Sequence, residues 1–166
     1  MRSVAAIFTA PVKSLSLEQC ESVTVGNTGI VEDRRFHLVD AEGRLLTQRQ
    51  EGRLVLVKAR YSAESDVLSL RFPDGQCLDG PTELGDALNT VIWGRQVPGR
   101  EVSGRWSEAL SEFCGSPVRL VKTENPGASY DEYPVSLLSQ ASIDFMGERL
   151  TSGRRFESKR FRPNFL

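Results

Sequence analysis

Short apolar runs separated by turn-forming residues constrain the fold of this chain more than any other feature. The runs VAAIF at 4–8, VLSLRF at 67–72 and QCL at 76–78 lie beside Gly, Pro or Ser residues. Runs of about four to eight residues of this kind favour β-strands over helices. The sequence therefore predicts a mainly β fold in which short strands follow one another.

Two of the turns between these runs have a clear physical basis. Pro73, Asp74 and Gly75 form a typical turn sequence, since proline presets φ and glycine accepts a positive φ. Gly43 has the same function in a predicted hairpin between FHLVD at 36–40 and RLLTQ at 44–48. ESVTV at 21–25 and LVLVKARY at 54–61 are further predicted strands.

A chain with many short strands and few helices can remove its exposed sheet edges by closing into a barrel. The predicted fold class is therefore mainly β and β-barrel-like, with a few short helices, and α+β overall. A small barrel fills its interior with side chains, so we expect function at the rim or in the loops.

Two segments have helical periodicity instead. In the first, Trp106, Leu110 and Phe113 share one face, and Gly115 follows as a predicted C-cap. In the second, Ser139 is a predicted N-cap and the apolar positions are Ile143, Met146 and Leu150.

Between the two helices the sequence changes character. Residues 122–135 are polar, rich in turn formers and locally acidic, which is typical of a long connection. We therefore expect a β-barrel domain at 1–121 and a linker with the first part of another domain at 122–166.

Composition excludes several classes of protein. Hydrophobic residues make up 39% and charged residues 26%, and the formal net charge is -1. These values are typical of a folded chain without a general attraction to nucleic acids or membranes. The apolar run before Pro11 is too short for a secretory signal, and no window has membrane-spanning length. The expectation is a cytoplasmic protein with no membrane partner.

Cysteine and histidine do not indicate a catalytic or metal site. Cys20, Cys77 and Cys114 form no CxxC pair, so we expect buried free thiols. His37 is the single histidine and the only candidate base for a nucleophilic site, but it lies in a predicted strand. We assign no catalytic residue and no metal ligand.

Polar groups gather where predicted strands end. Lys13 and Ser14 follow Pro11 at the first strand exit, residues 33–35 have the sequence DRR, and residues 47–49 have the sequence TQR. Arginine binds phosphate through a planar fork, lysine binds it as a point charge, and serine adds a hydroxyl donor. These groups are candidates to converge on one anion, although each of them alone is typical of a solvated turn.

The C-terminal stretch is basic. Between Glu148 and Arg162 the cations are Arg149, Arg154, Arg155, Lys159, Arg160 and Arg162. This pattern, with Phe156 and Phe161 between the charges, leaves RNA or single-stranded DNA binding open as an alternative, although the near-neutral total charge disfavours it. Pro163 also stiffens the backbone between Arg162 and Asn164, two groups that can address one ligand.

Taken together, these motifs resemble one family. APVKSL, GIVEDRRFHLVD, GRLLTQRQ, SPVRLV, YPVSLLSQAS and RFRPNFL occur in the order seen in MOSC proteins with an N-terminal β-barrel domain. That group includes YcbX-like bacterial proteins and the mitochondrial amidoxime-reducing component. The resemblance covers nearly the whole chain and implies a MOSC N-terminal β-barrel domain followed by an incomplete MOSC domain.

The resemblance also implies a molybdenum cofactor and the residues that hold it. Lys13 and Ser14 would contact its phosphate or pterin, and Arg35 would be a second cation, with Arg34 as its close alternative. Arg162 and Asn164 would hold the pterin from the MOSC side. The loop around Glu132 and Tyr133 would approach the cofactor as well.

In the family a cysteine thiolate binds molybdenum, as a soft ligand for this metal. That cysteine lies beyond the FRPN motif, so we expect the metal-ligating segment to be missing from these 166 residues. None of the three cysteines matches its position. The family's acidic residues near that cysteine are missing too.

The activity implied by the resemblance belongs to a longer parent protein. It is an oxidoreductase that reduces N-hydroxylated compounds, with electrons from a ferredoxin-like or reductase domain, or a sulfur-transfer protein. Some MOSC domains are linked to pyridoxal-phosphate sulfur-transfer enzymes, but no lysine here is in an identifiable Schiff-base context. A non-catalytic β-barrel module that binds a phosphate-containing ligand or a protein partner remains the alternative.

Overall fold

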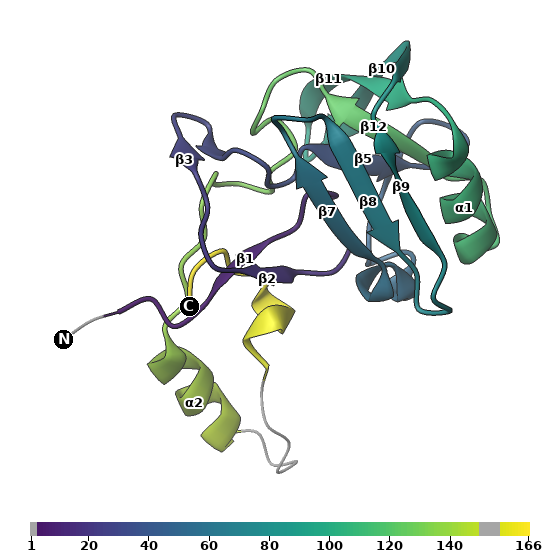
Figure 1. Ribbon diagram of the computed structural model, residues 1–166. Coiled ribbons are helices and arrows are strands. Elements are labelled where there is room, and N and C mark those ends of the chain that lie inside the picture. The colour runs from purple at the N-terminus through teal and green to yellow at the C-terminus, as the bar shows by residue number, and fades with distance from the viewer. Residues whose placement is uncertain (1–2, 150–156) are drawn as a thin grey trace.

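A computed structural model describes residues 3–149 and 157–166 (Figure 1). The elements are β1 Ile7–Thr9, β2 Glu18–Cys20, β3 Val25–Gly26, β4 Gly29–Ile30, β5 Phe36–Val39, β6 Leu45–Leu46, η1 Gly52–Leu56, β7 Lys58–Ser62, β8 Val67–Arg71, β9 Cys77–Pro81, β10 Leu84–Ile92, β11 Arg95–Val102, α1 Arg105–Cys114, β12 Arg119–Thr123, α2 Gln140–Arg149 and η2 Ser158–Phe161. Strands dominate this order, so the prediction of a mainly β fold is confirmed.

The largest sheet has five strands in the order β10-β11-β12-β5-β6, and all its neighbours are antiparallel. The sheet curls until its two outer strands, β10 and β6, contact each other. Leu120 of β12 pairs with Leu38 of β5, and both side chains are fully buried. The contact between the two outer strands closes the sheet on itself, as the predicted barrel-like fold requires.

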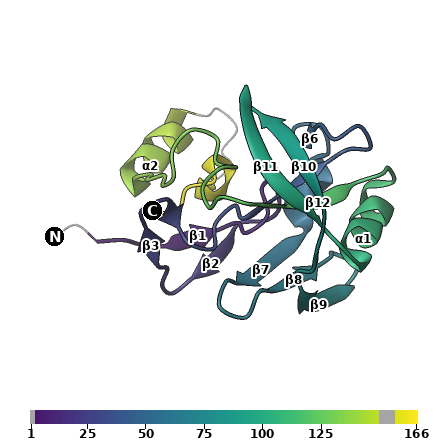
Figure 2. The same ribbon diagram turned by 90° about the horizontal axis from the view of Figure 1, so that it is seen from above.

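A second sheet has the order β7-β8-β9 and lies against the first (Figure 2). Its burial alternates along the strands, as expected for a sheet with one solvated face. Ala59, Tyr61, Leu68 and Leu70 face the core, which also receives Trp106 from α1. The side chains between them therefore project outward from β7 and β8.

The β10–β11 hairpin was not predicted from the sequence. Its turn consists of Trp93 and Gly94, with φ of 51° and 79°. Two positive φ values in a two-residue loop are typical of a type I′ turn, whose twist matches that of the strands. Tryptophan is not a usual residue for this position, so the sequence carries only the glycine as a signal.

Two predicted strands are wrong over part of their length. Residues 21–24 are not in a strand, because β2 ends at Cys20 and β3 begins at Val25. Residues 54–56 belong to η1, where the Glu51 side chain accepts a hydrogen bond from the Arg53 N–H at 3.0 Å. That local cap favours a helical turn over the strand that the β-branched residues suggest.

The predicted helices are confirmed in the described residues. Gly115 ends α1 in the left-handed conformation at φ 71°, and Ser139 Oγ accepts from the Ser142 N–H at the start of α2. Leu150, the last predicted apolar position of the second helix, lies outside the described residues. Within the described chain, neither helix has the length and apolar character needed to cross a lipid bilayer.

The C-terminal segment returns to the first strand. Phe165 forms bridges with Ile7 and with Leu137, and the Leu166 N–H donates to the Ala6 carbonyl at 3.0 Å. Figures 1 and 2 show η2 beside β1 and β2, although these segments lie at opposite ends of the sequence. This pairing places the FRPN motif near the strand ends that precede Lys13 and Arg34.

Candidate anion-binding site

Residues from six parts of the chain line one small pocket at the strand ends. They are Lys13, Ser14, Arg34, Thr47, Gln48, Arg49, Trp93, Asp131 and Arg162. The KS, DRR and TQR motifs were predicted to be able to converge on one anion, and the structure brings a side chain from each of them together. The β10–β11 turn and the loop after β12 supply the two lining residues that the sequence did not indicate.

Three of the pocket's cations, Lys13, Arg34 and Arg162, are largely withdrawn from solvent, whereas Arg49 is exposed. Lys13 is 5% exposed and Arg34 is 8% exposed. Burial lowers the pKa of Lys13, although a hydrogen bond to Asp131 acts in the opposite direction. Burial, and then the nearby Arg34 charge, lower the pKa of Arg162 to about 10. Buried cations are costly unless an anion compensates them. Asp131 compensates Lys13 and Asp33 compensates Arg34, whereas Arg162 has no ion pair within the described residues and so favours a negatively charged ligand.

Arg162 has hydrogen-bonding capacity to spare. Its Nη2 is buried and has no hydrogen-bond partner within the described part of the chain. Buried donors without partners are rare in folded proteins, and a ligand is one reason for them. Arginine and lysine donors with a serine hydroxyl make a donor set that fits a phosphate group.

Asp33 is a buried carboxylate that connects the segments around the pocket. Its carboxylate is fully buried, accepts from the Ala10 N–H at 2.6 Å and from Asn164 Nδ2 at 3.1 Å, and forms an ion pair with Arg34. One carboxylate therefore ties the first strand, the DRR motif and the FRPN motif to one another.

The structure separates the two remaining candidates from the pocket lining. Asn164 is buried in a network in which its amide oxygen accepts from Ser136 and its Nδ2 donates to the Phe8 carbonyl at 3.2 Å. Arg35 holds β12 through its carbonyl, which accepts from Thr123, and does not line the pocket. Of the two adjacent arginines, Arg34 is the one in the pocket, while cofactor binding by either stays a prediction.

The backbone of the pocket is strained in a consistent way. Ser14, Arg34, Trp93 and Arg162 all have positive φ, at 74°, 49°, 51° and 52°. Elsewhere in the described residues, Asp66 is the one other non-glycine residue in this region. Such a conformation costs about 1–3 kcal/mol for each residue and is concentrated at ligand sites. Four of the five non-glycine residues with positive φ in the described chain therefore line this pocket.

Asp131 supplies the anion that the pocket contains in this structure. Its Oδ1 accepts from Lys13 Nζ at 2.6 Å and from Trp93 Nε1 at 2.7 Å, and the Arg49 guanidinium lies 5.0 Å above the Trp93 ring. Burial pushes the pKa of Asp131 up, but the hydrogen bond and charge of Lys13 outweigh it and hold the pKa below its usual range. The acidic loop was the only sequence signal for this residue.

The space left beside this carboxylate is small. The cavity has a volume of about 30 Å³, which is close to the volume of one water molecule. The donor set therefore fits a phosphate group in charge, and the Asp131 carboxylate occupies the space next to Lys13.

The other residues singled out in the sequence lie elsewhere. Glu132 and Tyr133 are exposed and do not line the pocket. The prediction of buried thiols holds for Cys114 and is wrong for Cys77, which is exposed, while Cys20 is intermediate. The described residues contain no cluster of three or more His, Cys, Asp or Glu side chains with metal-binding geometry. Arg154 and Arg155 of the basic stretch lie outside the described residues.

Comparison with known proteins finds one family profile and several distant relatives that match this chain. The family profile described as the MOSC N-terminal beta barrel domain matches residues 1–117. Mitochondrial amidoxime-reducing component 1 of Mus musculus is 27% identical over 99% of this chain and 55% of its own length, and the Xenopus laevis protein is 29% identical over 89% and 50%. Molybdenum cofactor sulfurase of Danio rerio is 23% identical over 88% of this chain and 20% of its own length.

The chain spans about half the length of the amidoxime-reducing relatives. The profile match covers well over half of the chain, and the observed fold is the mainly β one that the profile describes. The chain therefore belongs to the MOSC N-terminal β-barrel domain family.

Proposed function

We propose that this chain holds the phosphate end of a molybdenum cofactor in the strand-end pocket, as part of a MOSC-family oxidoreductase or sulfur-transfer protein. The observation that carries the proposal is the convergence of Lys13, Arg34 and Arg162, all largely buried, on one small cavity. The names of the relatives, which refer to amidoxime reduction and to molybdenum cofactor sulfuration, support the identity of the ligand.

Each pocket residue has a distinct task in this proposal. Lys13 contributes a point charge, and Arg34 is oriented by its ion pair with Asp33. Arg162 offers its Nη2, a buried nitrogen that has no hydrogen-bond partner among the described residues. Trp93 provides an apolar face at the rim on which a pterin ring could stack. The cofactor, when bound, supplies the metal for oxygen-atom, electron or sulfur transfer.

The proposal also includes an activity for the whole protein to which this chain would belong. By analogy with the amidoxime-reducing relatives, it is the reduction of N-hydroxylated compounds, with electrons delivered by a ferredoxin-like or reductase partner. Fold and family alone do not establish an activity, so the binding step is the one to test first.

Charge removal at the pocket tests cofactor binding. Lys13→Ala and Arg162→Gln are each expected to weaken binding of molybdopterin, measured by titration calorimetry, at least about tenfold, because each removes a charge-assisted hydrogen bond. Arg44→Gln is the matched control, since Arg44 pairs with Asp40 and Glu42 outside the pocket. A folded wild-type chain that shows no saturable binding of molybdopterin would contradict the proposal.

Removal of the resident carboxylate should have the opposite effect. Asp131→Asn is expected to tighten binding of inorganic phosphate roughly tenfold, because the ligand no longer competes with a carboxylate for Lys13. Asp86→Asn, which neutralises an exposed carboxylate outside the pocket, should leave the affinity unchanged. Unchanged or weaker phosphate binding by Asp131→Asn would show that Asp131 does not occupy the ligand's position.

One observation favours a second candidate function. The cavity of about 30 Å³ is close to the size of a single small group rather than a pterin. A non-catalytic module that binds a smaller phosphate-containing ligand fits that volume as well. Saturable binding of inorganic phosphate without binding of molybdopterin would favour this module over the cofactor.

A further inference from the structure

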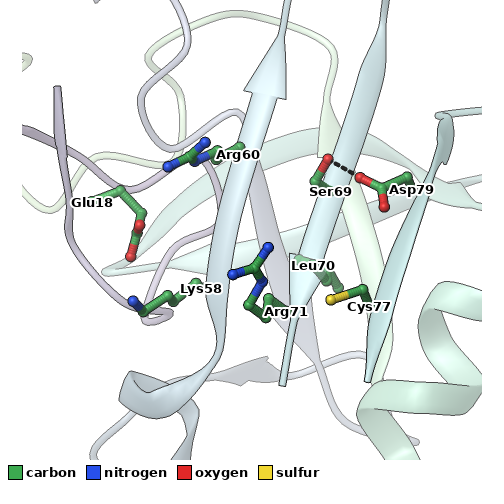
Figure 3. Close-up of a pocket in the computed structure, with 8 residues that line it drawn as sticks. All are labelled: Glu18, Lys58, Arg60, Ser69, Leu70, Arg71, Cys77 and Asp79. Carbon is green, nitrogen blue, oxygen red and sulfur yellow. Dashed lines mark hydrogen bonds between the residues drawn. The ribbon is translucent and has the colours of Figure 1, made fainter. Parts of the chain in front are cut away.

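A second charged cleft lies on the outer face of the β7-β8-β9 sheet (Figure 3). It has a volume of about 240 Å³, and none of its lining residues belongs to the strand-end pocket. Figure 3 shows Lys58, Arg60 and Arg71 projecting from the two neighbouring strands β7 and β8, with Glu18 of β2 facing them. The cleft therefore gathers three cations outside the proposed cofactor site.

The strand register places these cations in an unfavourable arrangement. Lys58 of β7 lies directly opposite Arg71 of β8. Arg60, two residues along β7, lies opposite Ser69 and is therefore diagonal to Arg71 on the same face. Like charges directly opposite each other destabilise a sheet. A shift of one residue would have separated the charges, but the buried face of the sheet determines the register.

Two carboxylates, Glu18 and Asp79, line the same cleft and offset part of this charge without pairing directly with the three cations. Within the described part of the chain, Lys58, Arg60 and Arg71 have no ion pair and no side-chain hydrogen bond. Glu18 faces the cleft without a salt bridge to any of them, and the Asp79 carboxylate is engaged by the Ser69 hydroxyl. The cations are therefore available to an anion from solution.

We infer that this cleft binds a small phosphate monoester. Two guanidinium groups and an ammonium group supply the charged donors that a phosphate monoester accepts, and they outnumber the two carboxylates of the lining. The volume of about 240 Å³ is below the range of about 300–1,000 Å³ that is typical of pockets for drug-sized molecules, which favours a compact ligand. Glu18 on the opposite wall favours a ligand with a donor group, such as a hydroxyl or an amine, beside the phosphate.

The rate at which Cys77 is alkylated reports whether a ligand occupies the cleft, because its thiol lines the cleft. Its thiol is exposed and lines the cleft, where residue 77 pairs with Arg71 across β8 and β9. Cys20 is partly buried and does not line this cleft, so it serves as an internal reference in the same molecule. The experiment is to alkylate the full chain with neutral iodoacetamide and to measure both cysteines by peptide mass spectrometry.

Inorganic phosphate and glycerol 3-phosphate are the probes. Both should slow alkylation of Cys77 in a saturable way and leave Cys20 unchanged, whereas sodium chloride at equal ionic strength should have no such effect. Arg71→Gln and Lys58→Gln should each raise the half-protecting concentration about tenfold, as expected for loss of a charge-assisted contact. Lys13→Ala and Arg44→Gln should leave it unchanged, which separates this cleft from the cofactor pocket.

Three results would overturn the inference. The first is the absence of saturable protection in wild-type protein whose thermal unfolding is cooperative, and the second is protection that sodium chloride reproduces. The third is protection by a hexaglutamate peptide without protection by either phosphate probe, which would assign the cleft to an acidic protein segment instead. Lys58→Gln serves as the test variant if Arg71→Gln does not fold, because both cations face the same space.

Discussion

Asp33→Asn is expected to lower the free energy of unfolding by about 3–5 kcal/mol, the range seen when one partner of a buried ion pair is removed. Asp33 is fully buried, and its two oxygens accept from the Ala10 N–H, from Asn164 and from Arg34. An asparagine amide keeps the shape but places an NH₂ group against donors. Chemical denaturation followed by tryptophan fluorescence measures the change.

The control for this prediction is another carboxylate. Asp86→Asn changes an exposed residue and should alter the free energy of unfolding by less than about 0.5 kcal/mol. A loss below about 1 kcal/mol in Asp33→Asn would mean that the three segments joined by Asp33 hold together without its charge. The proposed cofactor site would then have a different anchor.

Stability should also fall as the pH is lowered from about 7 to about 4, and His37 supplies a large share of that change. Its imidazole is fully buried with Nε2 2.9 Å from Thr90 Oγ1. Burial, and secondarily the charge of Lys13, lower the pKa of His37 to about 4. In the unfolded chain its pKa is about 6.5, so the unfolded state takes up the proton first. The loss at pH 4 is about 3 kcal/mol.

Comparison with a variant isolates the histidine from the carboxylates, several of which have lowered pKa values and also favour unfolding in acid. His37→Gln keeps a neutral polar side chain and should reduce the difference in unfolding free energy between pH 7 and pH 4 by about 3 kcal/mol. An NMR titration of the native protein gives an independent check. A native His37 that titrates near pH 6.5 would refute the prediction.

Much of the candidate site could be predicted because it depends on residue type and on strand ends. Lys13, Arg34 and Arg162 stand out since each follows or precedes a proline or a predicted strand, and such positions gather at one rim of a β fold. The resemblance favoured Arg35, with Arg34 as its alternative, whereas Arg34 is the one that lines the pocket. This difference depends on the direction of a side chain at the start of β5, which residue identity does not determine.

Asp131 and Trp93 could not be found in the same way. Trp93 lies at the tip of a hairpin that carries only one weak turn signal, and Asp131 is one of several acidic residues in a polar loop. Their hydrogen bond at 2.7 Å joins positions 38 residues apart and exists because that loop packs back over the rim. Contacts between residues so far apart in the sequence depend on the whole fold rather than on the local conformational preferences of each residue.

The amino-acid pattern by itself determined the mainly β class, the two helices and the basic groups available at the strand ends, because strand length, turn residues and charge are local properties. Only the tertiary structure decided that a carboxylate occupies the strand-end pocket and that Lys58 and Arg71 lie side by side on the outer sheet. Register and loop packing decide such pairings, and both follow from burying the apolar face of each strand.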